Sequence, residues 1–126
     1  SQGVFAPAVV NSYTNFLGGT WRKTGNVLEQ WLTYQTTQIN NYNEGAQQFP
    51  FPTAFSGTPI VVKANAYTHH DSAGNASISI ASIDNGFVFP PPSATQFAVV
   101  ISISGTNGIW YRNYVGTFTV YAKGTV

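Results

Sequence analysis

The alternation of apolar and small polar residues is the feature that most constrains the fold of this chain. Between residues 77 and 83 the order Ser-Ile-Ser-Ile-Ala-Ser-Ile places Ile78 and Ile80 on one face of an extended segment, with small polar side chains on the other. A period of two residues is typical of a half-buried β-strand. Similar alternation, or enrichment in Val, Ile, Thr, Tyr and Phe, predicts further strands at residues 27–36, 60–67, 97–104 and 117–122.

Clusters rich in Gly, Pro, Asn and Asp separate these strands at intervals of roughly 8 to 12 residues, which is typical of a sandwich or barrel. They lie at residues 18–19, 43–45, 72–75, 84–86, 90–92 and 105–108. Strong helix formers are scarce, and no amphipathic stretch is long enough for a helix. We therefore predict an all-β fold: an antiparallel β-sandwich of about six to eight strands in residues 26–126. Residues 1–25 are less regular and are expected to form a connector or an N-terminal strand.

The composition excludes several classes of partner. Charged residues make up 7% of the chain and Ser, Thr, Asn and Gln a third of it, so we expect a polar but uncharged surface. The formal net charge of +1 gives no field that would attract nucleic acid. No apolar run approaches the roughly 18 residues of a membrane helix, which argues against membrane insertion. The absence of cysteine excludes disulfides and zinc–thiolate sites, and the absence of methionine indicates a fragment or a processed form.

The few titratable residues argue against catalysis. Glycoside hydrolysis needs two carboxylates about 5 to 10 Å apart. If neighbouring strands run antiparallel, the 68–76 and 84–96 loops lie at opposite ends of the domain, which separates Asp71 from Asp84. Adjacent residues of an extended segment point in alternate directions, so His69-His70-Asp71-Ser72 is not a catalytic triad. We therefore expect no catalytic residue, no enzymatic activity and no cofactor.

His69 and His70 are the remaining candidates for metal binding. One chain supplies too few ligands for a tetrahedral site, although a trimer could bring three copies of one histidine to its axis. A polar segment with two solvated imidazoles is the simpler interpretation, and we predict no resident metal. With ordinary pKa values near ~6.5, either histidine could also make binding depend on pH.

Two loops rich in aromatic and polar residues form the candidate binding site. By the same antiparallel argument, the 68–76 and 105–113 loops lie at one end of the domain. Aromatic rings stack on the apolar face of a sugar while polar groups hold its hydroxyls, so this mixture favours carbohydrate. The candidates are Tyr67, His69, His70, Asp71 and Asn75 from the first loop and its edge, and Trp110, Tyr111, Arg112 and Asn113 from the second. The alternative, in which Trp110 and Tyr114 point into the core, stays open.

Several motifs, taken in order, resemble the C-terminal receptor-binding tip domains of bacteriophage tail fibres. The segment 48–62 resembles their strand-entry motif, in which Phe-Pro and a second Phe precede Pro and β-branched residues. Gly25 with Glu29-Gln30-Trp31 resembles their Gly-x-x-x-Gln-Trp element. Downstream, Asn85-Gly86-Phe87-Val88 resembles their Gly-Phe-Thr-Val, and the segment 118–124 resembles their closing aromatic strand.

This resemblance, which covers about residues 25–126, implies a homotrimeric knob at the tip of a virion tail fibre, joined to an upstream fibre shaft. It implies attachment to a bacterial host through a surface glycan, such as lipopolysaccharide or capsule, or through another outer-membrane receptor, without turnover. The Phe-Pro pattern is also similar to H-type lectins, trimeric sandwiches that bind N-acetylgalactosamine, so a lectin from a non-phage source is one alternative. A domain that only caps or trimerises a fibre, or that decorates a virion, is the other.

Overall fold

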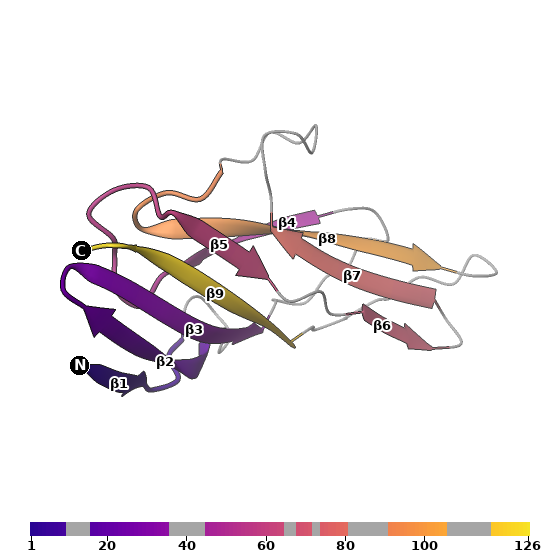
Figure 1. The fold of residues 1–126 in the computed structure, drawn as a ribbon. Coiled ribbons are helices and arrows are strands. Elements are labelled where there is room, and N and C mark those ends of the chain that lie inside the picture. The colour runs from indigo at the N-terminus through magenta and orange to yellow at the C-terminus, as the bar shows by residue number, and fades with distance from the viewer. Residues whose placement is uncertain (10–15, 36–44, 65–67, 72–73, 81–90, 106–116) are drawn as a thin grey trace.

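The computed structural model describes residues 1–9, 16–35, 45–64, 68–71, 74–80, 91–105 and 117–126, which form two antiparallel β-sheets (Figure 1). None of these residues is helical, so the prediction of an all-β antiparallel fold is confirmed, and the two sheets are consistent with a β-sandwich. The described part of the chain accordingly holds no helix that could span a membrane.

The five-stranded sheet has the order β1 (Gln2–Phe5), β2 (Phe16–Thr24), β3 (Val27–Gln35), β9 (Thr117–Thr125) and β5 (Val61–Ala64). The four-stranded sheet has the order β4 (Gly45–Pro50), β8 (Gln96–Gly105), β7 (Gly74–Ile80) and β6 (Thr68–Asp71). Each pair of neighbouring strands is antiparallel. The five strands predicted from the sequence overlap β3, β5, β7, β8 and β9.

The glycines at 18 and 19 do not form the turn that the sequence predicted. They lie inside β2, where the pairing with β3 shifts register between Phe16 and Gly18, as it does at a β-bulge. Gly18 has a φ of 107°, which favours glycine. A Cβ atom on Gly19 would collide with the carbonyl oxygen of Trp31 on the neighbouring strand. Both positions therefore need glycine for reasons that arise within a strand.

The N-terminal region supplies β1 and β2 of the five-stranded sheet. A two-residue turn at Gly25 and Asn26 joins β2 to β3, and Gly25 has a φ of 61°. Both termini lie beside this turn, since the Lys23 amide donates to the Ser1 carbonyl at 2.8 Å and the Val126 amide to the Asn26 carbonyl at 2.9 Å (Figure 1). The division of the chain near residue 25 stays a prediction, but the strands before it are hydrogen-bonded into the same sheet as β3.

Aromatic rings from both sheets fill the space between them. Tyr34 of β3 is fully buried, with its ring centroid 5.2 Å from those of Phe49 and Phe97 and 5.8 Å from that of Phe118. Its hydroxyl donates to the Pro50 carbonyl at 2.7 Å, so the polar atom of this core ring is satisfied. Burial raises the pKa of Tyr34, because the charged phenolate would lose its hydration.

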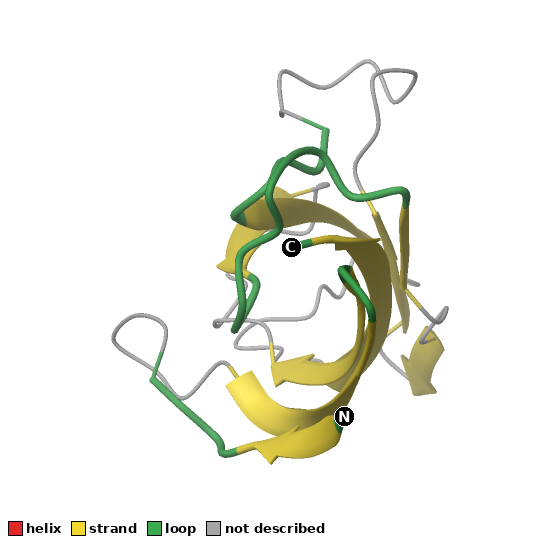
Figure 2. Cartoon of the chain, turned by 60° about the vertical axis from the view of Figure 1, so that its left-hand side comes forward, coloured by secondary structure: helices red, strands yellow, loops and turns green. Residues whose placement is uncertain are grey.

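The loop after β4 is anchored to the sheet by a buried amide. Gln30 of β3 has no exposed surface, and its Nε2 donates to the Thr53 carbonyl at 3.1 Å while its Oε1 accepts from the Thr53 amide at 3.3 Å. The same loop carries the buried rings of Phe51 and Phe55. It reaches the end of β9, where the Ser56 amide donates to the Thr125 carbonyl at 2.8 Å (Figure 2). Much of the Phe-Pro motif and of the Gln-Trp element therefore builds the core.

Candidate functional site

Five of the nine candidate binding residues predicted from the sequence lie outside the described residues. This applies to Tyr67, Trp110, Tyr111, Arg112 and Asn113. A carbohydrate site made by these side chains stays a prediction.

The segment 68–76 is a pair of strands rather than the loop that we expected. His69 lies opposite Ala76, and His70 opposite Asn75, in the antiparallel pairing of β6 with β7. The alternating pattern begins only at Ser77, but ladder hydrogen bonds need only backbone groups, so the pairing continues into polar residues. The side chains of these residues, and of Asp71, lie outside what the structure describes.

The antiparallel argument holds within the four-stranded sheet. Gly74 pairs with Gly105, so the start of β7 and the end of β8 lie at the same end of that sheet. The argument is wrong for β8 and β9, which belong to different sheets because the chain crosses between them. Among the described residues, no group of three or more His, Cys, Asp or Glu side chains could hold a metal ion. A site at His69 and His70 on a trimer axis is not tested by this observation.

The best-defined polar and aromatic cluster in the described part of the chain lies on the five-stranded sheet, on the side away from the core. Along β3 the buried residues alternate with Glu29, Trp31 and Thr33, which point outward. We define the outer face by Thr20 and Arg22 of β2, Glu29 and Trp31 of β3, Tyr121 and Lys123 of β9, and Lys63 of β5. The strand register places Thr20, Trp31, Tyr121 and Lys63 in one row across the sheet, and Arg22, Glu29 and Lys123 in the next.

Trp31 is held at this face with 39% of its surface exposed. Its ring centroid lies 5.4 Å from that of Tyr121, with 48° between the ring planes. On the other side, the guanidinium carbon of Arg22 lies 5.6 Å from the centroid of the indole, within the range of a cation–π contact. The indole therefore has a neighbour on each side and a free surface between them.

Glu29 ties together the two residues that contact Trp31. Its Oε1 accepts from Nη2 of Arg22 at 2.6 Å and from Nε at 3.1 Å, and its Oε2 accepts from the Tyr121 hydroxyl at 2.6 Å. These hydrogen bonds, from Tyr121 first and then from Arg22, lower the pKa of Glu29. Burial and the hydrogen bond to Glu29 raise the pKa of Tyr121 to about 12, so the phenol remains a donor at neutral pH. The carboxylate therefore sets the orientation of both Trp31 neighbours.

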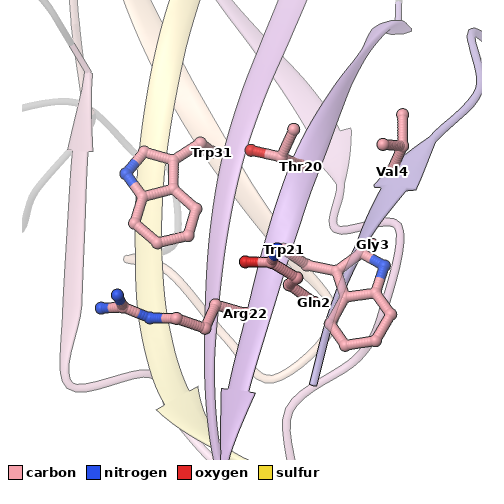
Figure 3. Close-up of a pocket in the computed structure, with 7 residues that line it drawn as sticks. All are labelled: Gln2, Gly3, Val4, Thr20, Trp21, Arg22 and Trp31. Atoms are coloured by element: carbon pink, nitrogen blue, oxygen red, sulfur yellow. The ribbon is translucent and has the colours of Figure 1, made fainter.

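A groove of about 510 Å³ adjoins Trp31 at the β1 edge of the sheet. It is lined by Gln2, Gly3, Val4, Thr20, Trp21, Arg22 and Trp31 (Figure 3). The rings of Trp31 and Trp21 extend to opposite sides of the strands (Figure 3). Trp21 packs against Gly3, where a Cβ atom would lie 2.6 Å from the ring, so the glycine lets this indole cover the edge strand β1 from the core side.

This arrangement offers the two kinds of contact that a saccharide needs. The indole of Trp31 presents a flat apolar surface, and the hydroxyl of Thr20, the amide of Gln2 and the guanidinium of Arg22 offer hydrogen bonds beside it. The volume of the groove, about 510 Å³, lies within the range of small-molecule binding sites, about 300 to 1,000 Å³.

The sequence did not lead us to predict a site at this cluster. One signal for it exists in the sequence, because within residues 27–35 Glu29 and Trp31 alternate with Leu28 and Leu32, which predicts that they point away from the core. Nothing in the order of residues indicates that Arg22 and Tyr121, 99 positions apart in number, lie on either side of the same indole. Comparison of the chain with protein-family models, curated proteins and solved structures found no match.

Proposed function

We propose that this chain is the receptor-binding tip of a bacteriophage tail fibre and that it binds a bacterial surface glycan without turning it over. The observation that carries glycan binding is the exposed indole of Trp31, oriented by Arg22 and Tyr121 beside a polar groove. A preorganised aromatic surface contributes to affinity because little conformational entropy is lost on binding. The tail-fibre context is supported by the order of the sequence motifs and by the all-β antiparallel fold.

Binding without turnover is supported by the state of Glu29. Both of its oxygens already accept hydrogen bonds, and its pKa is lowered, so at neutral pH it has no proton to give to a leaving group. The other carboxylate among the described residues, Asp71, belongs to β6 in the four-stranded sheet rather than to this face. A glycosidase would need a second carboxylate within about 10 Å of the first.

We also propose that the functional unit is a homotrimer. Val9 and Leu17, which lie outside the groove, expose 66% and 37% of their surfaces, which leaves apolar area available for contacts between copies. Three identical sites would raise the avidity for a repetitive glycan well above the affinity of one site. Light scattering after size exclusion tests this point, and a monomer at micromolar concentration would contradict it.

A glycan array tests the binding proposal. We expect purified protein to bind at least one lipopolysaccharide or capsular polysaccharide, and Trp31→Ala to weaken that binding by about tenfold or more. Ile60→Ala is the control, because it removes an exposed apolar side chain outside the groove. Trp110→Ala tests the predicted loop site on the same array. If the intact protein binds no glycan and no bacterial cell, the proposal is wrong and a domain that only caps or trimerises a fibre is favoured.

A further inference from the structure

The basic residues that the structure describes, Arg22, Lys23, Lys63 and Lys123, all lie on the five-stranded sheet. The whole chain has five Lys and Arg residues and four Asp and Glu residues. Arg22, Lys63 and Lys123 all lie on the outer face, where Glu29 is the one carboxylate among the described residues. A chain with a net charge of +1 therefore presents a locally cationic face around its exposed indole.

The single charge of Glu29 offsets that of Arg22, with which it is paired, and leaves the outer face with a net positive charge from the two lysines. The Glu29 carboxylate is already occupied by Arg22 and by Tyr121, at 2.6 Å each. Lys123 lies opposite Glu29 in the register, and Lys63 lies opposite Tyr121. Side chains directly opposite each other in an antiparallel pair have Cβ atoms about 4.5 to 5.5 Å apart. The register therefore places Lys63 and Lys123 on the outer face beside the aromatic pair, on the side away from the β1 groove.

From this arrangement we infer that the glycan bound at the outer face is acidic: a saccharide chain whose carboxylate or phosphate group lies against Lys63 and Lys123 while a sugar ring stacks on Trp31. This inference rests on the proposed function, since it names the class of glycan that the same site takes. The aromatic pair supplies a surface for the ring, and the lysines supply charge-assisted hydrogen bonds to the acid. A neutral glycan would leave both ammonium groups without a partner from the ligand.

Matched pairs of polysaccharides test the inference. On a glycan array, binding to capsular polysaccharides that contain uronic acids is compared with binding to their carboxyl-reduced forms. Binding to phosphate-containing polymers is compared with binding to their dephosphorylated forms. We expect binding to the acidic member of at least one pair and a loss of about tenfold or more on neutralisation, the usual effect of losing hydrogen bonds to a charged group. The two kinds of pair distinguish a carboxylate from a phosphate. Equal binding to both members, or to neutral polymers alone, would overturn the inference but leave glycan binding in place.

Substitution of the lysines tests where the acidic group of the glycan binds. Lys63→Gln and Lys123→Gln are each expected to weaken binding to the acidic polymer by several-fold, and added salt should weaken binding to the intact protein more than to either variant. Lys23→Gln is the matched control, because Lys23 is exposed on β2 but lies opposite buried Leu28, on the other side of the sheet from Arg22. If Lys23→Gln weakens binding to the acidic polymer equally, the effect comes from net charge alone and the inference is overturned. Comparable binding to single-stranded DNA would do the same, whereas no binding to any polysaccharide would overturn the proposed function itself.

Discussion

The two faces of the five-stranded sheet carry aromatic residues three positions apart on the same strands, yet different forces hold these rings in place. On the inner face, Tyr34 and Phe118 are enclosed by other rings from both sheets. On the outer face, Trp31 and Tyr121 touch each other and are oriented by a hydrogen-bonded ion pair. Burial fixes the first set, whereas charge and hydrogen bonds orient the second and leave part of its surface free. Residues of one strand can therefore build the core on one face and leave part of an aromatic surface exposed on the other.

The largest effect on stability should come from an inner ring. Phe49→Ala removes a fully buried ring that contacts Tyr34, Phe97 and Phe118, and it should lower the free energy of unfolding by about 3 to 5 kcal/mol. Urea denaturation measures this change. Ile60→Ala, at an exposed position, should change it by no more than about 0.5 kcal/mol. Similar losses for the two variants would contradict the distinction between buried and exposed apolar residues.

Two adjacent residues of β3 compare the faces directly. Leu32→Ala should lower the free energy of unfolding by about 2 to 5 kcal/mol, because Leu32 is buried in the core. Trp31→Ala removes a larger side chain but should cost only about 1 kcal/mol, because that ring is partly exposed and makes one aromatic and one cation–π contact. Denaturation of both variants under the same conditions measures the difference. If Trp31→Ala proves the more destabilising, the outer ring is part of the structural core.

The buried amide of Gln30 should have an intermediate effect. Gln30→Ala leaves the backbone amide and carbonyl of Thr53 without their partners and should lower the free energy of unfolding by about 1 to 3 kcal/mol. Thr53→Ala keeps those backbone groups and the hydrogen bonds of Gln30, so it should change stability by no more than about 0.5 kcal/mol. Equal effects would show that the contact depends on the threonine side chain instead.

The smallest effect should come from the titration of Glu29. The pKa of this carboxyl group is lowered in the folded state, so its contribution to stability is present above the unfolded value of about 4.3 and is lost as the pH falls through the folded value. Between about pH 5 and pH 2 the intact protein should therefore lose slightly more stability than Glu29→Gln. Tyr121→Phe, which removes one of the hydrogen bonds, should show a reduced dependence on pH. Parallel curves for all three proteins would contradict this assignment.

The Phe-Pro segment and the Gln-Trp element show how much of the structure could be predicted from local sequence. The Phe-Pro segment predicts an entry into a strand, and its phenylalanines prove to be core residues because apolar rings are buried wherever two sheets can enclose them. The Gln-Trp element divides between the two faces: Gln30 is buried against the loop after β4, and Trp31 lies on the outer face. The period of two residues predicts this division but does not say which face meets the second sheet.

The sequence by itself determined the class of fold, since alternation and β-branched residues favour strands over helices through local geometry alone. It also predicted five of the strands within a few residues of where they lie. The tertiary structure decided which strands pair, because pairing depends on backbone partners far apart along the chain: β9 lies between β3 and β5, and Gly18 and Gly19 lie in a strand rather than in a turn. That pairing brings Arg22, Glu29, Trp31 and Tyr121 together, and with them the exposed and oriented indole on which the proposed function rests.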